Sequence, residues 1–217
     1  MRAPVGHRRR RLFAAALGPV LAAGITSAAD ADRGRYVLHS LTERANPGLT
    51  VSKPLDQFRA VSRARVVVPA EWRRLRAKPG LLRFITPRSN CRYQVVFSVA
   101  SRLAAPRAAV DYVADALPSP SASRLLDSGQ RGNSAFRVIH EQGKGAVVSL
   151  RALWAGVLTR RADIAPAGQI AWSELGVTAA SRPGDECHSG TWRDVLGPQL
   201  GDALATARTR LAFVRPR

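Results

Sequence analysis

The densest cluster of residues able to do chemistry is GDECHSGTW, residues 184–192. Asp185, Glu186 and His188 could ligate a metal ion or supply an acid and a base, because both tasks need accessible lone pairs held close together. Neighbouring side chains in a loop usually point apart, however, and the segment lacks the second pair of ligands that a zinc site needs. We therefore interpret it as a polar loop tethered by a disulfide through Cys187, with those three residues as weak metal candidates.

Recognised catalytic motifs are missing from the sequence. It has no G-x-S-x-G nucleophile elbow and no H-E-x-x-H zinc motif, and the G-K-G at residues 143–145 lacks the glycine spacing and hydroxyl residue of a phosphate-binding loop. His140 precedes Glu141 on an expected strand, so their side chains should point to opposite faces. The sequence therefore predicts no catalytic residue and no cofactor, and a hydrolase built on residues 184–192 and His140 is the alternative.

The sequence contains two cysteines, Cys91 and Cys187. In an exported chain such a pair most often forms one disulfide. This bridge would close a loop of almost a hundred residues, to which the chain-entropy model assigns about 4 to 5 kcal/mol. Two buried free thiols are the alternative.

The N-terminus has the pattern of an export signal. Four arginines at residues 8–11 precede an apolar stretch of fourteen residues at 12–25, and Ala29-Asp30-Ala31 matches an A-x-A cleavage site. A helix that spans a bilayer needs about 20 residues, so we expect a cleaved signal rather than a retained anchor. The arginines also match a twin-arginine signal loosely, which leaves the export route open.

The whole chain has a formal net charge of +19. Removing residues 1–31, with five arginines and Asp30, leaves 29 basic and 14 acidic residues, or +15. An exported protein with this charge should be attracted to anionic polymers and phospholipid head groups of the cell envelope, and export argues against a nucleic-acid target. We expect a secreted or envelope protein whose partner is an anionic envelope polymer or another exported protein, with peripheral membrane association as a further option and the oligomeric state open.

A second candidate surface lies in the stretch VVVPAEWRRLR, residues 66–76. Trp72 and the arginines after it could form a basic-aromatic binding patch. In the structural interpretation, which we favour, the indole caps one end of the core and the arginines lie in solvent. Trp172, on the opposite face of the sheet, is a further interface candidate. The tentative binding residues are Trp72, Arg73, Arg74, Arg76 and Trp172.

Most of the elements that would position these groups are strands. We assign residues 1–31 to the signal, 32–62 to an N-terminal arm with a short strand at 36–41, and 63–217 to the folded domain. The strand at 146–159 is apolar on both faces and should be central. Periodicity and turn signals predict the domain's strands at 65–68, 81–86, 93–100, 124–128, 136–141, 146–159, 170–180 and 211–214.

Two helices complete the predicted fold. The first follows Pro106, and the second covers residues 198–209, with Arg208 and Arg210 in a last turn where cations suit the helix dipole. The apolar stripe of the first comprises Val110, Val113, Ala114 and Leu117. Antiparallel hairpins with two separated helices indicate an α+β fold, a mostly antiparallel sheet covered by two helices, with one disulfide.

The order of elements resembles the PsbP-like α/β/α sandwich, a superfamily that includes the photosystem accessory protein PsbP and LpqN-type actinobacterial lipoproteins. The likeness covers about residues 60–215 and depends on the strand ending in VPAEW, the hairpin strands through Val99, the single helix, the meander to WSELGVTAA and the terminal LGPQLGDALATARTRLAFV. This chain lacks the lipoprotein cysteine and carries a cysteine pair that is not associated with the family.

Members of this superfamily are mostly accessory or partner-binding proteins without a shared catalytic site, so the resemblance implies binding rather than catalysis. The expected function is that of an exported, non-enzymatic binding or accessory protein acting on an envelope component or on another exported protein. A structural protein that coats a surface is a further alternative to the hydrolase.

Overall fold

The computed structural model describes residues 36–44, 59–87, 92–118, 123–142, 148–181 and 192–214. Every strand pair in these residues is antiparallel, and two α-helices and one π-helical turn accompany the strands, so the predicted α+β class is confirmed. The elements are β1 (Tyr36–Thr42), β2 (Arg59–Pro69), β3 (Arg73–Leu75), β4 (Leu81–Ile85), β5 (Tyr93–Ala104), α2 (Ala109–Ala116), β6 (Ser123–Arg131), β7 (Ser134–Gln142), β8 (Val148–Thr159), β9 (Ile170–Ser181), η1 (Trp192–Leu196), α4 (Gly197–Ala205) and β10 (Arg208–Val214).

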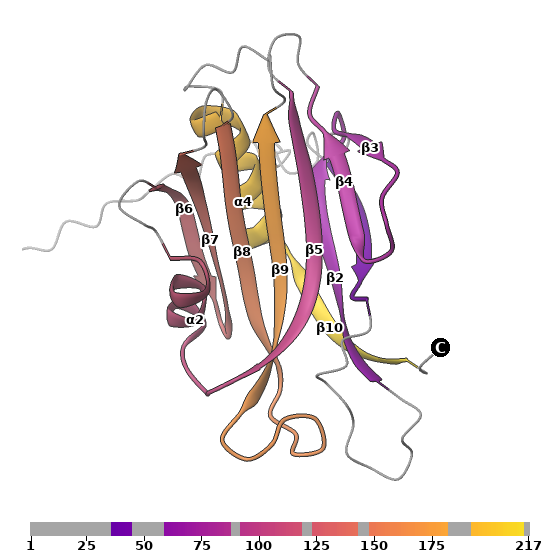
Figure 1. The fold of residues 1–217 in the computed structure, drawn as a ribbon, viewed down its shortest axis with the longest axis vertical. Coiled ribbons are helices and arrows are strands. Elements are labelled where there is room, and N and C mark those ends of the chain that lie inside the picture. The colour runs from indigo at the N-terminus through magenta and orange to yellow at the C-terminus, as the bar shows by residue number, and fades with distance from the viewer. Residues whose placement is uncertain are drawn as a thin grey trace, which may run out of the picture.

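The strands form two sheets (Figure 1). A seven-stranded sheet has the order β3-β4-β5-β9-β8-β7-β6, and a three-stranded sheet has the order β1-β2-β10. Within the larger sheet β8 lies between β9 and β7. It is therefore an interior strand, as the apolar character of both its faces predicts.

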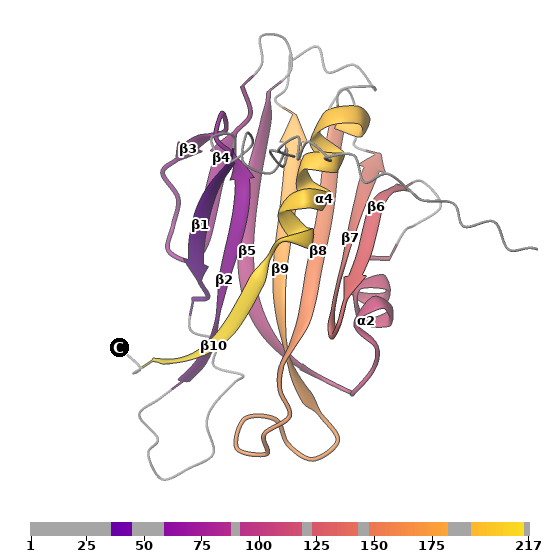
Figure 2. The same cartoon turned by 180° about the vertical axis from the view of Figure 1, so that it is seen from behind.

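The two helices lie against opposite faces of the seven-stranded sheet (Figures 1 and 2). Leu150 and Trp154 of β8 pack into the main core, which also holds residues of the three-stranded sheet and of α4. Leu153 and Ala155, whose side chains point to the other face of β8, pack with α2. Because successive side chains of a strand alternate between faces, β8 contributes to both cores, and the seven-stranded sheet is the middle layer.

The three-stranded sheet is built partly from the segment expected to be an N-terminal arm. The predicted strand at residues 36–41 is confirmed as β1, and β2 already begins at Arg59, so the boundary expected after residue 62 lies inside a strand. β2 pairs with β1 on one side and with β10 on the other. Its first half is rich in alanine and serine, which carry little strand preference of their own, so the local pattern predicts β2 only from Arg65.

The prediction for the C-terminal helix is wrong in its length. α4 ends at Ala205, four residues before the expected end, and Arg208 begins β10. The Thr206 hydroxyl donates to a carbonyl of α4 at 2.9 Å, and Nη1 of Arg208 donates to the Ala207 carbonyl at 2.9 Å. These bonds satisfy carbonyls near the helix end. Pairing with β2 then continues the chain as a strand, so Arg208 and Arg210 do not belong to a helix turn.

The buried side of α2 is also rotated from the predicted stripe. Ala109, Tyr112 and Val113 are buried, whereas Val110 is 46% exposed. The Tyr112 ring stacks on the indole of Trp172, with ring centroids 4.3 Å apart. Aromatic stacking adds to the gain from burial, so the pair orients the helix with Tyr112, and not Val110, against the sheet.

Glu43, which follows β1, joins the two sheets. Its side chain is buried, and Oε1 accepts a hydrogen bond from the Ser101 backbone N–H at 2.7 Å. Oε2 accepts from the Ser62 backbone N–H at 2.8 Å and from the Ser101 hydroxyl at 2.5 Å. Ser62 belongs to β2 and Ser101 to β5, and the Ser62 hydroxyl also bonds that of Ser173 on β9. A buried carboxylate needs such donors, and they connect β2 to the larger sheet.

Replacing Glu43 with alanine should lower the free energy of unfolding by about 3 kcal/mol, because the N–H groups of Ser62 and Ser101 would stay buried without an acceptor. Urea denaturation measures this loss. The control is E71A, which removes an exposed glutamate and should change the free energy by less than about 0.5 kcal/mol. Equal stability of the two variants would show that Glu43 does not join the sheets.

Gly201 allows β6 to approach α4 closely. A Cβ atom at this position would lie 1.8 Å from Oδ2 of Asp127, which follows a β-bulge in β6. Burial raises the pKa of Asp127, a hydrogen bond from the Ser128 backbone N–H at 2.8 Å opposes that rise, and nearby Asp202 adds to it. Only a residue without a side chain leaves room for this carboxylate against the helix.

We expect Gly201→Ala to destabilise the protein by about 1 to 3 kcal/mol through overpacking against Asp127, although alanine is the better helix former by about 1 kcal/mol. Removing the carboxylate as well, in D127A/G201A, should recover most of that loss. Thermal unfolding of both single variants and the double variant completes the cycle. A G201A protein as stable as the wild type would mean that the Asp127 carboxylate moves aside without cost.

Candidate functional site

Trp72 lies where the structural interpretation places it. Its side chain is 4% exposed and belongs to the main core, with its ring centroid 6.2 Å from that of Phe84. Arg73, Arg74 and Arg76 are exposed. The indole is therefore not available to a ligand, and the three arginines form a basic edge of the seven-stranded sheet without an aromatic face.

Trp172, the further interface candidate, is fully buried, so its indole is not exposed for an interface in this structure. It lies on β9 in the core that α2 covers, stacked on Tyr112. Its Nε1 has no hydrogen-bond partner within the described structure. Strand periodicity assigns Trp172 to the correct face of the sheet, but only the packing of α2 shows that this part of the face is covered.

Five residues selected from the sequence lie outside the described residues: Cys91, Cys187, Asp185, Glu186 and His188. The disulfide and the metal interpretation of the loop therefore stay predictions. Among the residues that the structure describes, no group of three or more histidine, cysteine, aspartate or glutamate side chains could hold a metal ion.

His140 and Glu141 point to opposite faces of β7. Glu141 forms an ion pair with Arg151 of β8, with 2.9 Å between Oε1 and Nη1. His140 pairs with Arg124 of β6 in the strand register. Burial, and then the charge of Arg124, lower the pKa of His140 below its ordinary value of 6.5. The two neighbours therefore lie on opposite faces of the strand, as strand alternation predicts.

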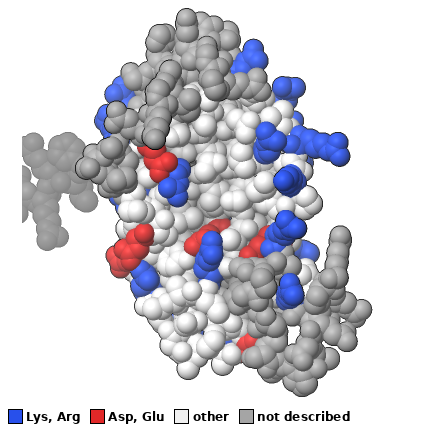
Figure 3. All heavy atoms as spheres, viewed as in Figure 1, with Lys and Arg blue, Asp and Glu red and all other residues white. Residues whose placement is uncertain are grey.

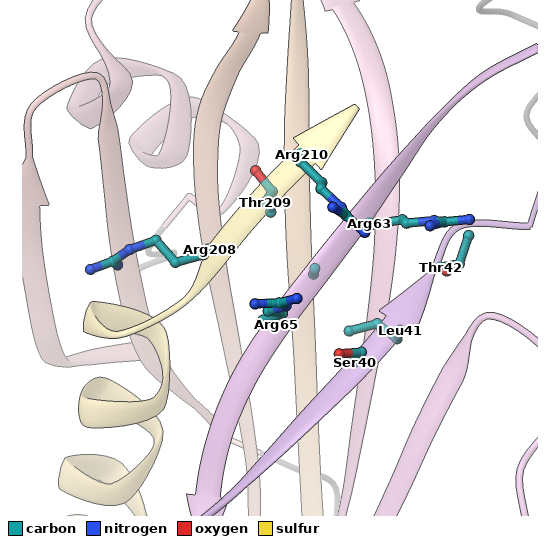
Figure 4. Close-up of a pocket in the computed structure, with 9 residues that line it drawn as sticks. Ser40, Leu41, Thr42, Arg63, Arg65, Arg208, Thr209 and Arg210 are labelled. Carbon is teal, nitrogen blue, oxygen red and sulfur yellow. The ribbon is translucent and has the colours of Figure 1, made fainter. Parts of the chain in front are cut away.

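The structure brings together four arginines on the outer face of the three-stranded sheet (Figure 4). They belong to β2 and β10, which are far apart in the sequence and adjacent in the sheet. Two hydroxyl residues of β1 extend the set. We call these six residues the arginine face, and across the sheet they form two rows, Thr42 with Arg63 and Arg210, and Ser40 with Arg65 and Arg208. They line a pocket of about 300 Å³.

The arginine face follows from an Arg-x-Arg pattern in β2 and another in β10. Residues two apart in a strand share a face. Ala64, between Arg63 and Arg65, is 1% exposed in the main core, so both guanidinium groups must point outward. Both Arg-x-Arg patterns are present in the sequence. The pattern of β10 is not recognised as part of a strand because a helix is expected through residue 209.

The positive charges of the arginine face are not neutralised by side chains that the structure describes. Its lining contains no acidic residue, and Arg63, Arg65 and Arg210 form no ion pair with a described carboxylate. Arg208 contacts the Ala207 carbonyl and extends away from the other three (Figure 4). Like charges opposite one another destabilise a sheet. An anion held between the guanidinium groups would relieve that repulsion.

A second hollow of about 650 Å³ lies beside α2, on the opposite face of the seven-stranded sheet. The Tyr112 hydroxyl donates to Glu174 at 2.6 Å, and Nε of Arg102 donates to the other carboxylate oxygen at 3.3 Å. Burial, and then the bond to Glu174, raise the pKa of Tyr112 well above 10. In the middle of the face that Figure 3 shows, acidic side chains lie beside basic ones, whereas basic side chains predominate along its right-hand edge. The charged side chains that line the hollow are Arg102, Arg151 and Glu174, and each forms an ion pair with a described residue.

No protein-family model, curated protein or solved structure matches this chain. Within the described residues, no helix is both long and apolar enough to cross a bilayer. The arginine face, which combines a pocket with uncompensated charge, is therefore the strongest candidate site in the described structure.

Neutralising one arginine of this face should stabilise the protein. Arg63→Gln removes repulsion with Arg65 and Arg210, so its melting temperature at low salt should exceed that of the wild type. The gain should vanish near 1 M salt, where the screening length is about 3 Å. Arg161→Gln is the control, because it breaks an ion pair with Asp163 and should bring no gain. If Arg63→Gln also brings none, the arginines do not repel one another appreciably.

Proposed function

We propose that the protein is exported and binds an anionic component of the cell envelope through the arginine face, without catalysing a reaction. The observation that carries this proposal is the double row of guanidinium groups on an exposed sheet face, with no carboxylate in the pocket lining. Guanidinium groups match phosphate and carboxylate oxygens with two parallel hydrogen bonds. The hydroxyl groups of Ser40 and Thr42 add donors beside them.

The sequence supports an envelope or secreted location for this binding. Residues 1–31, which lie outside the described residues, have the pattern of a signal cleaved near Ala31. The remaining chain has a charge of +15, which favours encounters with anionic polymers and head groups. An accessory role of the PsbP-like kind, with no catalytic residue, is part of the proposal.

The proposal includes a disulfide between Cys91 and Cys187. The described ends of β5 and β9 are paired at Tyr93 and Ser181. Cys91 precedes Tyr93 by two residues and Cys187 follows Ser181 by six. The described residues nearest to the two cysteines in the chain therefore lie at the same end of the sheet, and six residues can span up to about 20 Å, enough to allow two Cα atoms to come to bridging distance.

Polyphosphate, a linear polyanion, is the probe that tests the binding site. The two variants to compare are R63Q/R65Q/R210Q and R73Q/R74Q/R76Q, which each remove three exposed positive charges. Arg208 is left in place because it contacts a carbonyl beside α4. Calorimetric titration at physiological salt should show binding weakened at least about tenfold in the first variant, through lost charge-assisted hydrogen bonds, and by less than about twofold in the second.

Equal weakening in the two variants would mean that net charge alone holds the polymer, as expected of a protein that merely coats a surface, and would contradict a defined site. Weakening only in the second variant would move the site to the basic edge beside Trp72. In both variants an unchanged melting curve at high salt excludes unfolding as the cause.

A further inference from the structure

The outer face of the three-stranded sheet continues from the arginine face into an apolar patch. In the register Tyr36 pairs with Pro69 and Leu38 with Val67, and both β1 side chains share a face with Ser40, since residues two apart alternate together. Leu38 is 57% exposed and Tyr36 is 37% exposed. We call these two residues the apolar edge.

The described elements contact the three-stranded sheet from its inner side. β2 packs against β5, β9 and α4, and β1 packs against β4 and β5. These contacts belong to the side of the main core, which contains Val66 and Val68 of β2. Figure 2 shows β1, β2 and β10 in front of the larger sheet. The arginine face and the apolar edge therefore point together away from the rest of the described fold.

The two parts of this outer face lie within a small area. A strand rises about 3.4 Å per residue, so Leu38 and Thr42 are about 14 Å apart along β1. Neighbouring strands are about 4.8 Å apart, which places β10 about 10 Å from β1. A single flat surface could therefore touch the arginines and the apolar edge at the same time.

Among anionic partners, a lipid surface uses both parts of the face. A polyanion in water supplies phosphate groups to the arginines but leaves Leu38 exposed. At a bilayer surface the phosphate groups lie beside the boundary of the acyl chains, where an aliphatic side chain is removed from water and the amphipathic ring of a tyrosine is favoured. A second copy of this chain would bring like-charged arginine faces together, which opposes pairing through this face.

We infer that the outer face docks onto an anionic phospholipid surface, with the guanidinium groups on headgroup phosphates and the apolar edge inserted at the acyl boundary. This inference rests on the proposed function, because it uses the same arginines. Electrostatic attraction brings the protein to the surface, and Tyr36 and Leu38 hold it there. The protein is then a reversible peripheral membrane binder.

Co-sedimentation with vesicles tests this docking. The protein is purified in its exported form, with its N-terminus determined by mass spectrometry, so that all variants share the same processing. One set of vesicles contains phosphatidylcholine alone, and the other mixes it equally with phosphatidylglycerol. The variants are Y36S/L38S, L38S alone, and the control V110S/L125S, which removes two side chains that are each 46% exposed on α2 and β6.

The wild type and V110S/L125S should bind the phosphatidylglycerol vesicles and not phosphatidylcholine alone. Y36S/L38S should bind the phosphatidylglycerol vesicles at least about tenfold more weakly than the wild type, because two side chains no longer leave water. Its affinity for polyphosphate should stay unchanged. L38S should show an intermediate loss, and since Leu38 is more than half exposed, this variant keeps the test valid if the double variant unfolds.

Two results would overturn the inference and leave the proposed function standing. One is vesicle binding by Y36S/L38S as tight as that of the wild type. The other is a wild type that binds polyphosphate at the arginine face but does not bind phosphatidylglycerol vesicles, which would make a soluble polymer the ligand. If the wild type binds neither probe, the proposed function fails as well.

Discussion

The buried carboxylate of Glu43 is the contact on which the arrangement of the two sheets depends. It accepts hydrogen bonds from Ser62 of β2 and Ser101 of β5, so the small sheet cannot slide along the large one without leaving a charge unsatisfied. This connection holds the Ser62 face of β2 inward. Arg63 and Arg65 alternate with Ser62 along β2, so their side chains must then point outward. A shift of the strand register by one residue would exchange the two faces.

The arginine face and the hollow beside α2 differ in how their charges are compensated. Beside α2, Glu174 accepts bonds from Tyr112 and Arg102, so acid, hydroxyl and base satisfy one another. On the arginine face, like charges lie opposite one another on neighbouring strands, which raises the free energy of the unbound protein. Binding of an anion would relieve the repulsion on the arginine face. Beside α2, an anion would instead compete with Glu174 for its hydrogen bonds from Tyr112 and Arg102. This contrast directs the functional proposal to the outer sheet.

The elements with the plainest periodicity are those that local sequence predicts best. β5 alternates Tyr93, Val95 and Phe97 toward the core, and β9 matches its predicted bounds to within one residue. The errors occur where several structures suit the same residues. Alanine, threonine and arginine near residue 207 are compatible with a helix, and only pairing with β2 makes them a strand. Similarly, the buried side of α2 depends on the stacking of Tyr112 on Trp172. The periodicity of the helix sequence does not reveal this contact with β9.

The sequence by itself determines the fold class, the positions of most strands, the net charge and the burial of Trp72, because composition and short-range periodicity report what each segment must bury. Which arginines act together is a different matter. Arg63 and Arg210 are far apart in the chain and become neighbours through the register of β2 with β10. That register is set by long-range hydrogen bonds and burial, so only the tertiary structure decides where the arginine face forms and that the apolar edge lies beside it.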